Sequence, residues 1–308
     1  NFANKLWNAS RFVLMNLEGV DNKPFDSSKL TLVDKWILNQ LNETAKTVNE
    51  NMKEYRIGEI AHTLYDFFWN SYCDWYVEIA KIQLRDESLK LNTQRVLRYV
   101  LDMSLRMLHP IMPHITESVW QLIPKADGEK ASAIIVADYP VYSDDLAFPK
   151  EAKEMELVFD TITSLRNLRQ SFNIPTSREV NVEIRATEDE KPIFEAIESY
   201  IHRLAKVDSI SYADANKDLP PKSATAVVSG SKLIVPLADL INLDEEIARQ
   251  EKKMGKLTAE KNSLEGRMKN EKFVANAPKE LIEQTTARIA ELTEQENIIK
   301  DLIASLQG

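Results

Sequence analysis

Apolar residues recur every three or four positions through most of the first 122 residues, a pattern typical of helices that bury one face. The pattern predicts five helices, over about 2–17, 31–52, 57–84, 96–108 and 114–122. Thr31 and Asp34 suit the cap of the second helix, and Gly19 follows the first where a helix-ending glycine belongs. Five helices with short connections predict a bundle, which we assign to residues 1–147.

The middle of the chain mixes two periods. Helical spacing predicts helices over 150–172 and 190–205, whereas short alternating or β-branched runs predict strands over 180–184, 209–212, 224–228 and 232–237. Gly230 stands between the last two strands and suits a turn. Residues 148–242 are therefore expected to form a small α+β domain.

The last segment carries a heptad pattern in two runs. Apolar residues dominate positions that step by three and four, at 243, 247, 250, 254, 257, 261, 264 and 268, and again at 282, 285, 289, 292, 296, 299, 303 and 306. The stretch from Asn276 to Pro278 lies between the runs, and a proline there favours a chain reversal. Residues 243–308 are predicted to form an antiparallel coiled-coil hairpin, so the whole chain is expected to be mainly α.

Composition narrows the function classes. The 308 residues carry 39 basic and 48 acidic side chains, a net charge of −9, which argues against a general polyanion binder, so any nucleic-acid contact must come from a local face. The longest apolar runs are far too short to span a membrane. A single cysteine, Cys73, excludes an internal disulfide and fits a reducing, cytoplasmic compartment. The chain begins at Asn1 without a methionine or a leader, which predicts a piece of a longer protein.

Catalytic chemistry is not evident. No phosphate-binding glycine loop and no His-Glu-x-x-His motif occur. His109 and His114 flank two prolines at a spacing that fits neither face of a helix, so we expect no metal site. Cys73 lies among aromatic residues of a predicted helix and is interpreted as a buried, inert thiol.

The opening helix has a second, polar face. Asn4, Asn8 and Arg11 lie together on it, with Lys5 and Phe12 beside them. Amides, a guanidinium and an aromatic ring are the groups that bind unstacked single-stranded bases through edge hydrogen bonds, phosphate pairing and stacking. The same spacing also fits a solvated face with one partly buried phenylalanine, and spacing alone favours that reading.

The residues themselves resemble a known family. The stretch from Asn1 to Phe12 resembles the start of the anticodon-binding domain of valyl-tRNA synthetases. The blocks Ser71–Glu78 with Lys81, and Leu108–Glu117 with Trp120, resemble two further motifs of that domain. Arg166 and Arg169 followed by Ile174-Pro175 resemble the next segment, and Phe273–Pro278 between heptad runs resembles the turn of the family's C-terminal arm. His114 departs from the phenylalanine more usual there, which affects local packing only.

This resemblance implies a role in tRNA recognition. The bundle would read the anticodon loop of a tRNA for valine through Asn4, Lys5, Asn8, Arg11 and Phe12. The resemblance also implies a ligase that uses ATP with Mg, but the catalytic and editing domains would precede Asn1, so this fragment is expected to hold no cofactor and to act as a monomer. The equivalent region of an isoleucyl- or leucyl-tRNA synthetase, or a coiled-coil scaffold without an RNA role, remains as an alternative.

The hairpin would brace the tRNA elbow with its basic residues. Those residues are Arg249, Lys252, Lys253, Lys256, Lys269, Lys272 and Lys279. Nearby glutamates would instead pair with them if the arm were an ordinary coiled-coil surface, and the sequence leaves both readings open. The stretch Lys253–Lys256 resembles the lysine loop of class I synthetases, but Met254 occupies a heptad core position, so we interpret it as coiled coil.

Overall fold

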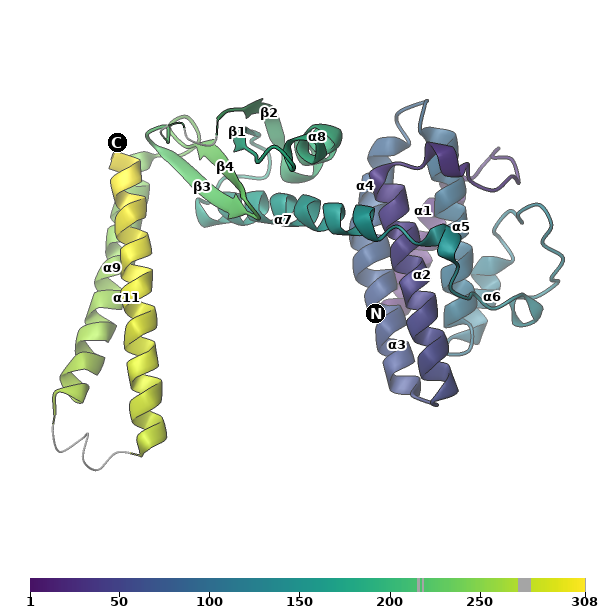
Figure 1. Cartoon of the computed structure of the whole chain (residues 1–308), viewed down its shortest axis with the longest axis horizontal. Helices are drawn as coiled ribbons and strands as arrows, with labels where there is room; N and C mark the ends of the chain where they lie inside the picture. The colour runs from purple at the N-terminus through teal and green to yellow at the C-terminus, as the bar shows by residue number, and fades with distance from the viewer. Residues whose placement is uncertain (215–216, 218, 271–277, 308) are drawn as a thin grey trace. The chain divides into compact units, whose positions relative to one another are not determined.

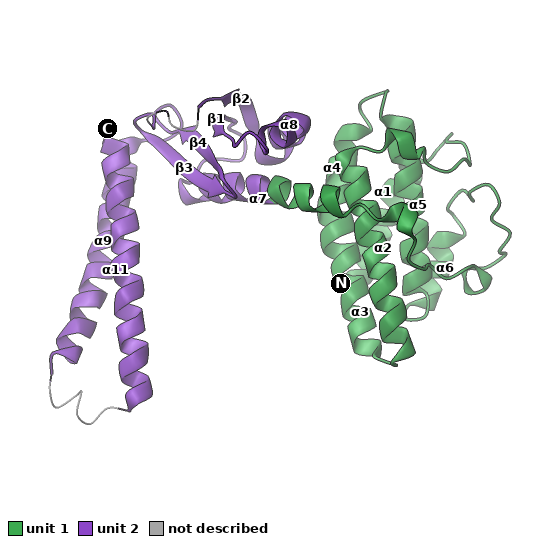
Figure 2. Ribbon diagram, viewed as in Figure 1, with its two compact units in different colours: residues 1–159 green, residues 160–308 purple. Residues whose placement is uncertain are grey.

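A computed structural model describes residues 1–214, 217, 219–270 and 278–307. The predicted mainly helical class with a small sheet is confirmed (Figure 1). The chain forms two compact units, Asn1–Phe159 and Asp160–Gly308 (Figure 2). The sheet and the C-terminal hairpin share the second unit, and the division into three functional domains stays a prediction.

The first unit is a helical bundle. Its helices, in chain order, are α1 (Phe2–Asn16), α2 (Leu32–Lys53), α3 (Ile57–Asp66), the π-helical η2 (Phe67–Tyr76), α4 (Val77–Gln83), α5 (Lys90–Leu108) and α6 (Pro113–Trp120). The predicted cap of α2 is confirmed. The Thr31 hydroxyl accepts a hydrogen bond from the backbone N–H of Asp34, and the Asp34 carboxylate accepts one from the backbone N–H of Thr31. The Tyr76 hydroxyl also donates to Asp34 over 2.7 Å, which ties η2 to the start of α2.

One predicted helix differs in detail. The segment over 57–84 is helical throughout, but its middle, η2, is a π-helix rather than an α-helix. Phe67 and Tyr72 are both buried, as are Phe68 and Cys73, and each pair is five residues apart. A π-helix is closed by i→i+5 hydrogen bonds, and its wider turn brings residues five apart closer to one face than an α-helix does, so all four side chains reach the core.

The second unit begins with the end of α7 (Pro149–Ser171) and contains a four-stranded sheet. Its elements are β1 (Val180–Arg185), α8 (Lys191–Ala205), β2 (Val207–Tyr212), β3 (Ser223–Val228) and β4 (Ser231–Pro236). The strand order is β2-β1-β4-β3, with β1 and β2 parallel across α8 and the other pairs antiparallel. Gly230 lies in the turn between β3 and β4, as predicted.

Arg166 and Arg169 of α7 hold the end of α8. Arg169 is 6% exposed and donates to the carbonyls of Lys206 and Pro175, each over 2.8 Å. Arg166 donates to the Leu204 carbonyl over 3.0 Å. The last carbonyl groups of a helix have no hydrogen-bond donor within it and carry partial negative charge. A guanidinium group supplies both a donor and a positive charge. These two family-like arginines therefore serve the fold of this unit.

The chain ends in two long helices, α9 (Leu243–Met268) and α11 (Lys279–Gln307), which lie side by side (Figure 1). The start of α9 and the end of α11 line one small cavity, so the pair is antiparallel. Six of the eight predicted heptad positions of α11 are buried and the other two are half-buried, and those of α9 are buried or half-buried. The predicted reversal at Asn276 and Ala277 lies outside the described residues.

Candidate nucleic-acid interface

The polar face of α1 is exposed as the sequence predicts. Asn4, Asn8 and Arg11 are exposed, whereas Leu6 and Val13 on the opposite face are fully buried. Lys5 and Phe12, at the border between the two faces, are half-buried. The helix therefore anchors one stripe in the bundle and presents a row of amide and guanidinium groups to solvent.

A groove of about 410 Å³ runs between α1 and the η2–α4 segment. Four of the five predicted residues line it, namely Asn4, Lys5, Asn8 and Phe12, and Arg11 lies outside it. The other wall consists of Trp69, Cys73, Asp74, Val77, Glu78 and Lys81. The tertiary structure thus turns the exposed face of one helix into one wall of a concave surface.

Both cations of the groove already have partners. Lys5 Nζ lies 2.6 Å from Asp74 Oδ1 and 3.8 Å from the centre of the Trp69 ring. Lys81 Nζ lies 2.5 Å from Glu78 Oε1 and 5.5 Å from the centre of the Phe12 ring. Two cations and two carboxylates cancel, so the groove offers amide groups and ring faces rather than net positive charge.

Arg11 differs from both lysines. It is exposed and forms no hydrogen bond or ion pair with another residue in the part of the chain that the structure describes. An exposed guanidinium without such a partner suits a phosphate or a base edge, since its planar donors bind either bidentately.

Cys73 forms part of the floor of this groove. The side chain is 8% exposed, and burial raises the pKa of its thiol to about 12. The thiolate, which is the nucleophile, is therefore scarce near neutral pH. The interpretation of Cys73 as an inert thiol fits this environment.

The sequence reasoning missed one wall of the groove. Trp69, Asp74, Glu78 and Lys81 were not predicted as site residues, although most of them fall in or beside a family-like block. A signal was present, because Asp74 and Glu78 stand four residues apart, one on each side of the buried Tyr76. Only the tertiary structure shows that this segment lies against α1.

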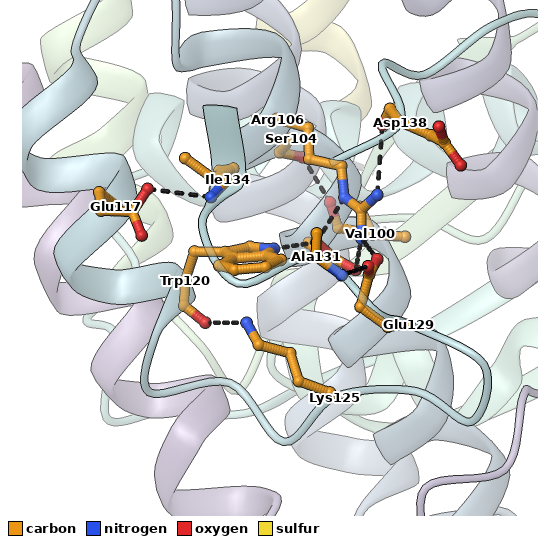
Figure 3. A network of polar contacts seen from close by, with 11 residues as sticks. Val100, Ser104, Arg106, Glu117, Trp120, Lys125, Glu129, Ala131, Ile134 and Asp138 are labelled. Carbon is orange, nitrogen blue, oxygen red and sulfur yellow. Dashed lines mark hydrogen bonds and ion pairs between the residues drawn. The ribbon is translucent and has the colours of Figure 1, made fainter. Parts of the chain in front are cut away.

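A second family-like block proves to be a packing unit. Trp120 is fully buried and donates from Nε1 to Asp102 over 2.6 Å, and Arg106 lies 2.9 Å from the same carboxylate and 2.5 Å from Glu129 (Figure 3). Lys125 stacks on the Trp120 ring, and burial lowers the pKa of its ammonium to about 8. This network fastens the loop after α6 to α5.

His109 belongs to the same region. Its Nδ1 lies 2.8 Å from the Thr116 hydroxyl, which joins the end of α5 to α6. Within the described ranges, no three His, Cys, Asp or Glu side chains come close enough to hold a metal ion. No described helix is both long and apolar enough to cross a membrane.

The cations of the hairpin separate into two groups. Lys252, Lys253, Lys256, Lys269 and Lys279 are exposed and have no ion-pair partner among the described residues. Arg249 does have partners, because its Nη2 lies 2.7 Å from Glu246 and also donates to the Ser171 carbonyl at the end of α7. Lys272 lies outside the described residues.

The sequence left open whether the basic residues of the hairpin pair with nearby glutamates or stay without a partner, and this separation bears on that question. Of the glutamates near the predicted lysines, Glu246 pairs with Arg249, whereas Glu245 accepts from Asn242 and Glu280 from Gln284. Arg249 therefore links the arm to α7, and the five lysines remain available to an anionic partner. Met254 is half-buried within the continuous helix α9, so the stretch Lys253–Lys256 is helical, as predicted.

Comparisons with known proteins agree with these features. Residues 34–184 match the family model of the anticodon-binding domain of tRNA ligases, and residues 242–307 match that of the valyl tRNA synthetase tRNA binding arm. The chain is 41% identical to the valine–tRNA ligase of Bacillus cereus (strain ATCC 14579), 39% to that of Enterococcus faecalis and 38% to that of Bacillus subtilis. Each match covers 100% of this chain and 35% of the relative. The chain thus spans about a third of the length of these curated relatives.

Proposed function

Because the chain belongs to the valyl-tRNA synthetase family and matches its C-terminal region, we propose that it is the tRNA-recognition region of a valine–tRNA ligase. The observation that carries the proposal is a set of exposed lysines, without ion-pair partners in the described part of the chain, on a hairpin that matches the tRNA binding arm. The lysines suit a polyanion, and the neutral groove of the bundle suits bases. Together they supply the two kinds of contact that RNA recognition needs.

We assign the anticodon loop to the groove between α1 and η2–α4. Asn4 and Asn8 offer amide donors and acceptors, Phe12 and Trp69 offer ring faces, and Arg11 stands exposed outside the groove, three residues after Asn8 on α1. Loop bases can leave their stack, rest on a ring and be read along their edges, and none of these steps needs net positive charge. The match to the anticodon-binding model begins at residue 34, so it includes the η2–α4 wall but not α1.

We assign the tRNA elbow to the arm. Lysine ammonium groups are flexible point charges that bind phosphates without reading sequence. Lys252, Lys253 and Lys256 fall within about one and a half turns of α9, so they present charge over a short stretch. The arm would thereby add affinity for any tRNA-like backbone, and the bundle would supply the choice among tRNAs.

The reaction itself would belong to parts of the enzyme beyond this chain. A valine–tRNA ligase joins valine to its tRNA with ATP and Mg, in the cytoplasm, and we propose no cofactor site in this fragment. The isoleucyl and leucyl alternatives are disfavoured by the match of residues 242–307 to the valyl arm. The scaffold alternative is disfavoured by five lysines without partners among the described residues.

The direct test is binding of this chain to tRNAs for valine, isoleucine and leucine over a range of salt. We expect the tRNA for valine to bind most tightly, with an affinity that falls linearly with salt on logarithmic axes. Equal binding to all three would contradict the anticodon assignment, and no binding would favour the scaffold. In the same preparation, valine-dependent ATP–pyrophosphate exchange is expected to stay at background, and exchange above background would contradict the placement of catalysis elsewhere.

A further inference from the structure

The interface between α9 and α11 has a charged layer in its middle. Heptad positions in both helices are largely apolar, but Lys261 and Glu296 occupy two of them. Glu296 is only 4% exposed. Both of its carboxylate oxygens are satisfied, one by the Thr258 hydroxyl and the other by the Lys261 ammonium. A carboxylate this buried is tolerable only because it has such partners.

The neighbours of this layer are apolar on both helices. Leu257 and Leu264 precede and follow Lys261 along the heptad positions of α9, and Leu292 and Ile299 flank Glu296 on α11. If α11 slid along α9 by one turn, about 5.4 Å, leucine and isoleucine would meet other apolar residues at little cost. Glu296 would instead face apolar side chains without a partner, which is strongly unfavourable, whereas the half-buried Lys261 would turn its ammonium toward water.

A buried ion pair is a weak source of stability, since well-packed apolar residues of similar volume often do as well or better. Its better-documented use is to exclude alternative registers of paired helices. The outer ion pairs of the arm cannot do this as well. Arg288 with Glu260 and Glu291 is roughly 40% exposed and can re-pair through water after a slip.

We propose that Thr258, Lys261 and Glu296 fix the register of α11 against α9. They are positioning residues, because they hold the two helices and touch no ligand themselves. The consequence for RNA rests on the proposed function: a fixed register keeps Lys279 of α11 at a constant distance along the arm from Lys269 of α9. A slip of one turn would move an ammonium group out of reach of a phosphate that it otherwise contacts.

The test measures the register directly in the full chain. Spin labels at Ala248→Cys and Ala290→Cys, both exposed, report the distance between α9 and α11 along the arm. Native Cys73 is buried and its pKa is about 12, so it is expected to escape labelling. The wild-type interface between α9 and α11 should give one narrow distribution of label-to-label distances. The double variant Lys261→Met/Glu296→Leu should stay helical and melt no earlier, yet it should add a second population displaced by about 5.4 Å.

Two further variants sharpen the result. The exchange Lys261→Glu/Glu296→Lys should restore one narrow distribution, because the charge pair is rebuilt. Leu292→Met, a conservative change in the same interface, should leave the distance distribution unchanged. A single narrow distribution in the apolar double variant would overturn the proposal, as would a broad distribution in the Leu292→Met control.

Binding of valine tRNA to the same variants separates this inference from the proposed function. If the apolar pair slips and loses tRNA affinity that the exchanged pair regains, both proposals are supported. If the distances change as expected but the arm makes no difference to tRNA binding in any variant, the register role stands and the assignment of the elbow to the arm fails.

Discussion

The groove of the bundle and the arm of the second unit handle charge in opposite ways. In the groove, Lys5 and Lys81 each lie against a carboxylate and an aromatic ring. On the arm, Lys252, Lys253 and Lys256 stand exposed without partners in the described chain. The first arrangement leaves polar edges and ring faces, whereas the second leaves exposed ammonium groups that no described carboxylate pairs with. With a net charge of −9, the chain would approach RNA through such local surfaces rather than through its overall charge.

The largest expected effect comes from removing the charge of the arm. The triple variant Lys252→Gln/Lys253→Gln/Lys256→Gln should bind every tRNA more weakly. The affinity should fall by up to about tenfold per lost phosphate contact near 0.1 M salt. The slope of log affinity against log salt should flatten by roughly 0.7–0.9 for each contact. Salt-dependent filter binding measures both quantities. The triple Lys→Arg variant, which keeps the charge, is the matched control, and an unchanged slope in the Gln variant would remove the arm as an RNA brace.

Substitutions on α1, in the groove and beside it, are expected to weaken binding less and to act on selectivity. Arg11→Ala and Phe12→Ala should each weaken binding of valine tRNA by about 1–3 kcal/mol, through a lost bidentate contact and lost stacking respectively. Discrimination against other tRNAs should relax in both. Arg11→Ala should leave the melting temperature nearly unchanged, because the side chain is exposed and has no partner in the described chain. If either variant binds valine tRNA as tightly as the wild type does, the substituted residue does not contact the anticodon loop.

A third change would make the groove resemble the arm. Asp74→Asn removes the carboxylate that pairs with Lys5 and leaves the groove with net positive charge. We expect tighter binding of all tRNAs, by no more than about tenfold, together with a steeper salt slope and weaker discrimination. Stability should change little, since Asp74 is half exposed and such ion pairs contribute little to folding. Unaltered discrimination would show that compensation of Lys5 is unimportant for selectivity.

The smallest expected effect is on the helicity of the arm at low pH. The hydrogen bond from Lys261 holds the pKa of Glu296 below its ordinary value of 4.5, so the pair favours the folded arm above that pH. This contribution is lost as the pH falls through the lowered pKa. Helicity of the arm in acid titrations should therefore decline slightly earlier in wild type than in Lys261→Met/Glu296→Leu, which has no charge to lose. Identical acid profiles would show that the pair contributes no pH-dependent stability.

Local patterns were sufficient for most of the fold. Helical spacing, the Thr31 cap and the prolines after Leu108 act within a few residues, so their outcome can be read from the chain. The heptad runs predicted which side chains of α9 and of α11 lie toward the partner helix, because that period repeats over many turns. The π-helical turn was missed, since the five-residue spacing of Phe67 with Tyr72 and Phe68 with Cys73 was read as α-helical.

The sequence by itself determined the face of α1 that carries Asn8 and Arg11, because a helix sorts its side chains by period alone. Only the tertiary structure decided that Asp74 meets Lys5, 69 residues away, and that Arg249 is fastened to Ser171 while Lys252 is not. Whether a cation is free or paired depends on which distant carboxylate or carbonyl the folded chain brings within about 4 Å, and no local pattern encodes that distance.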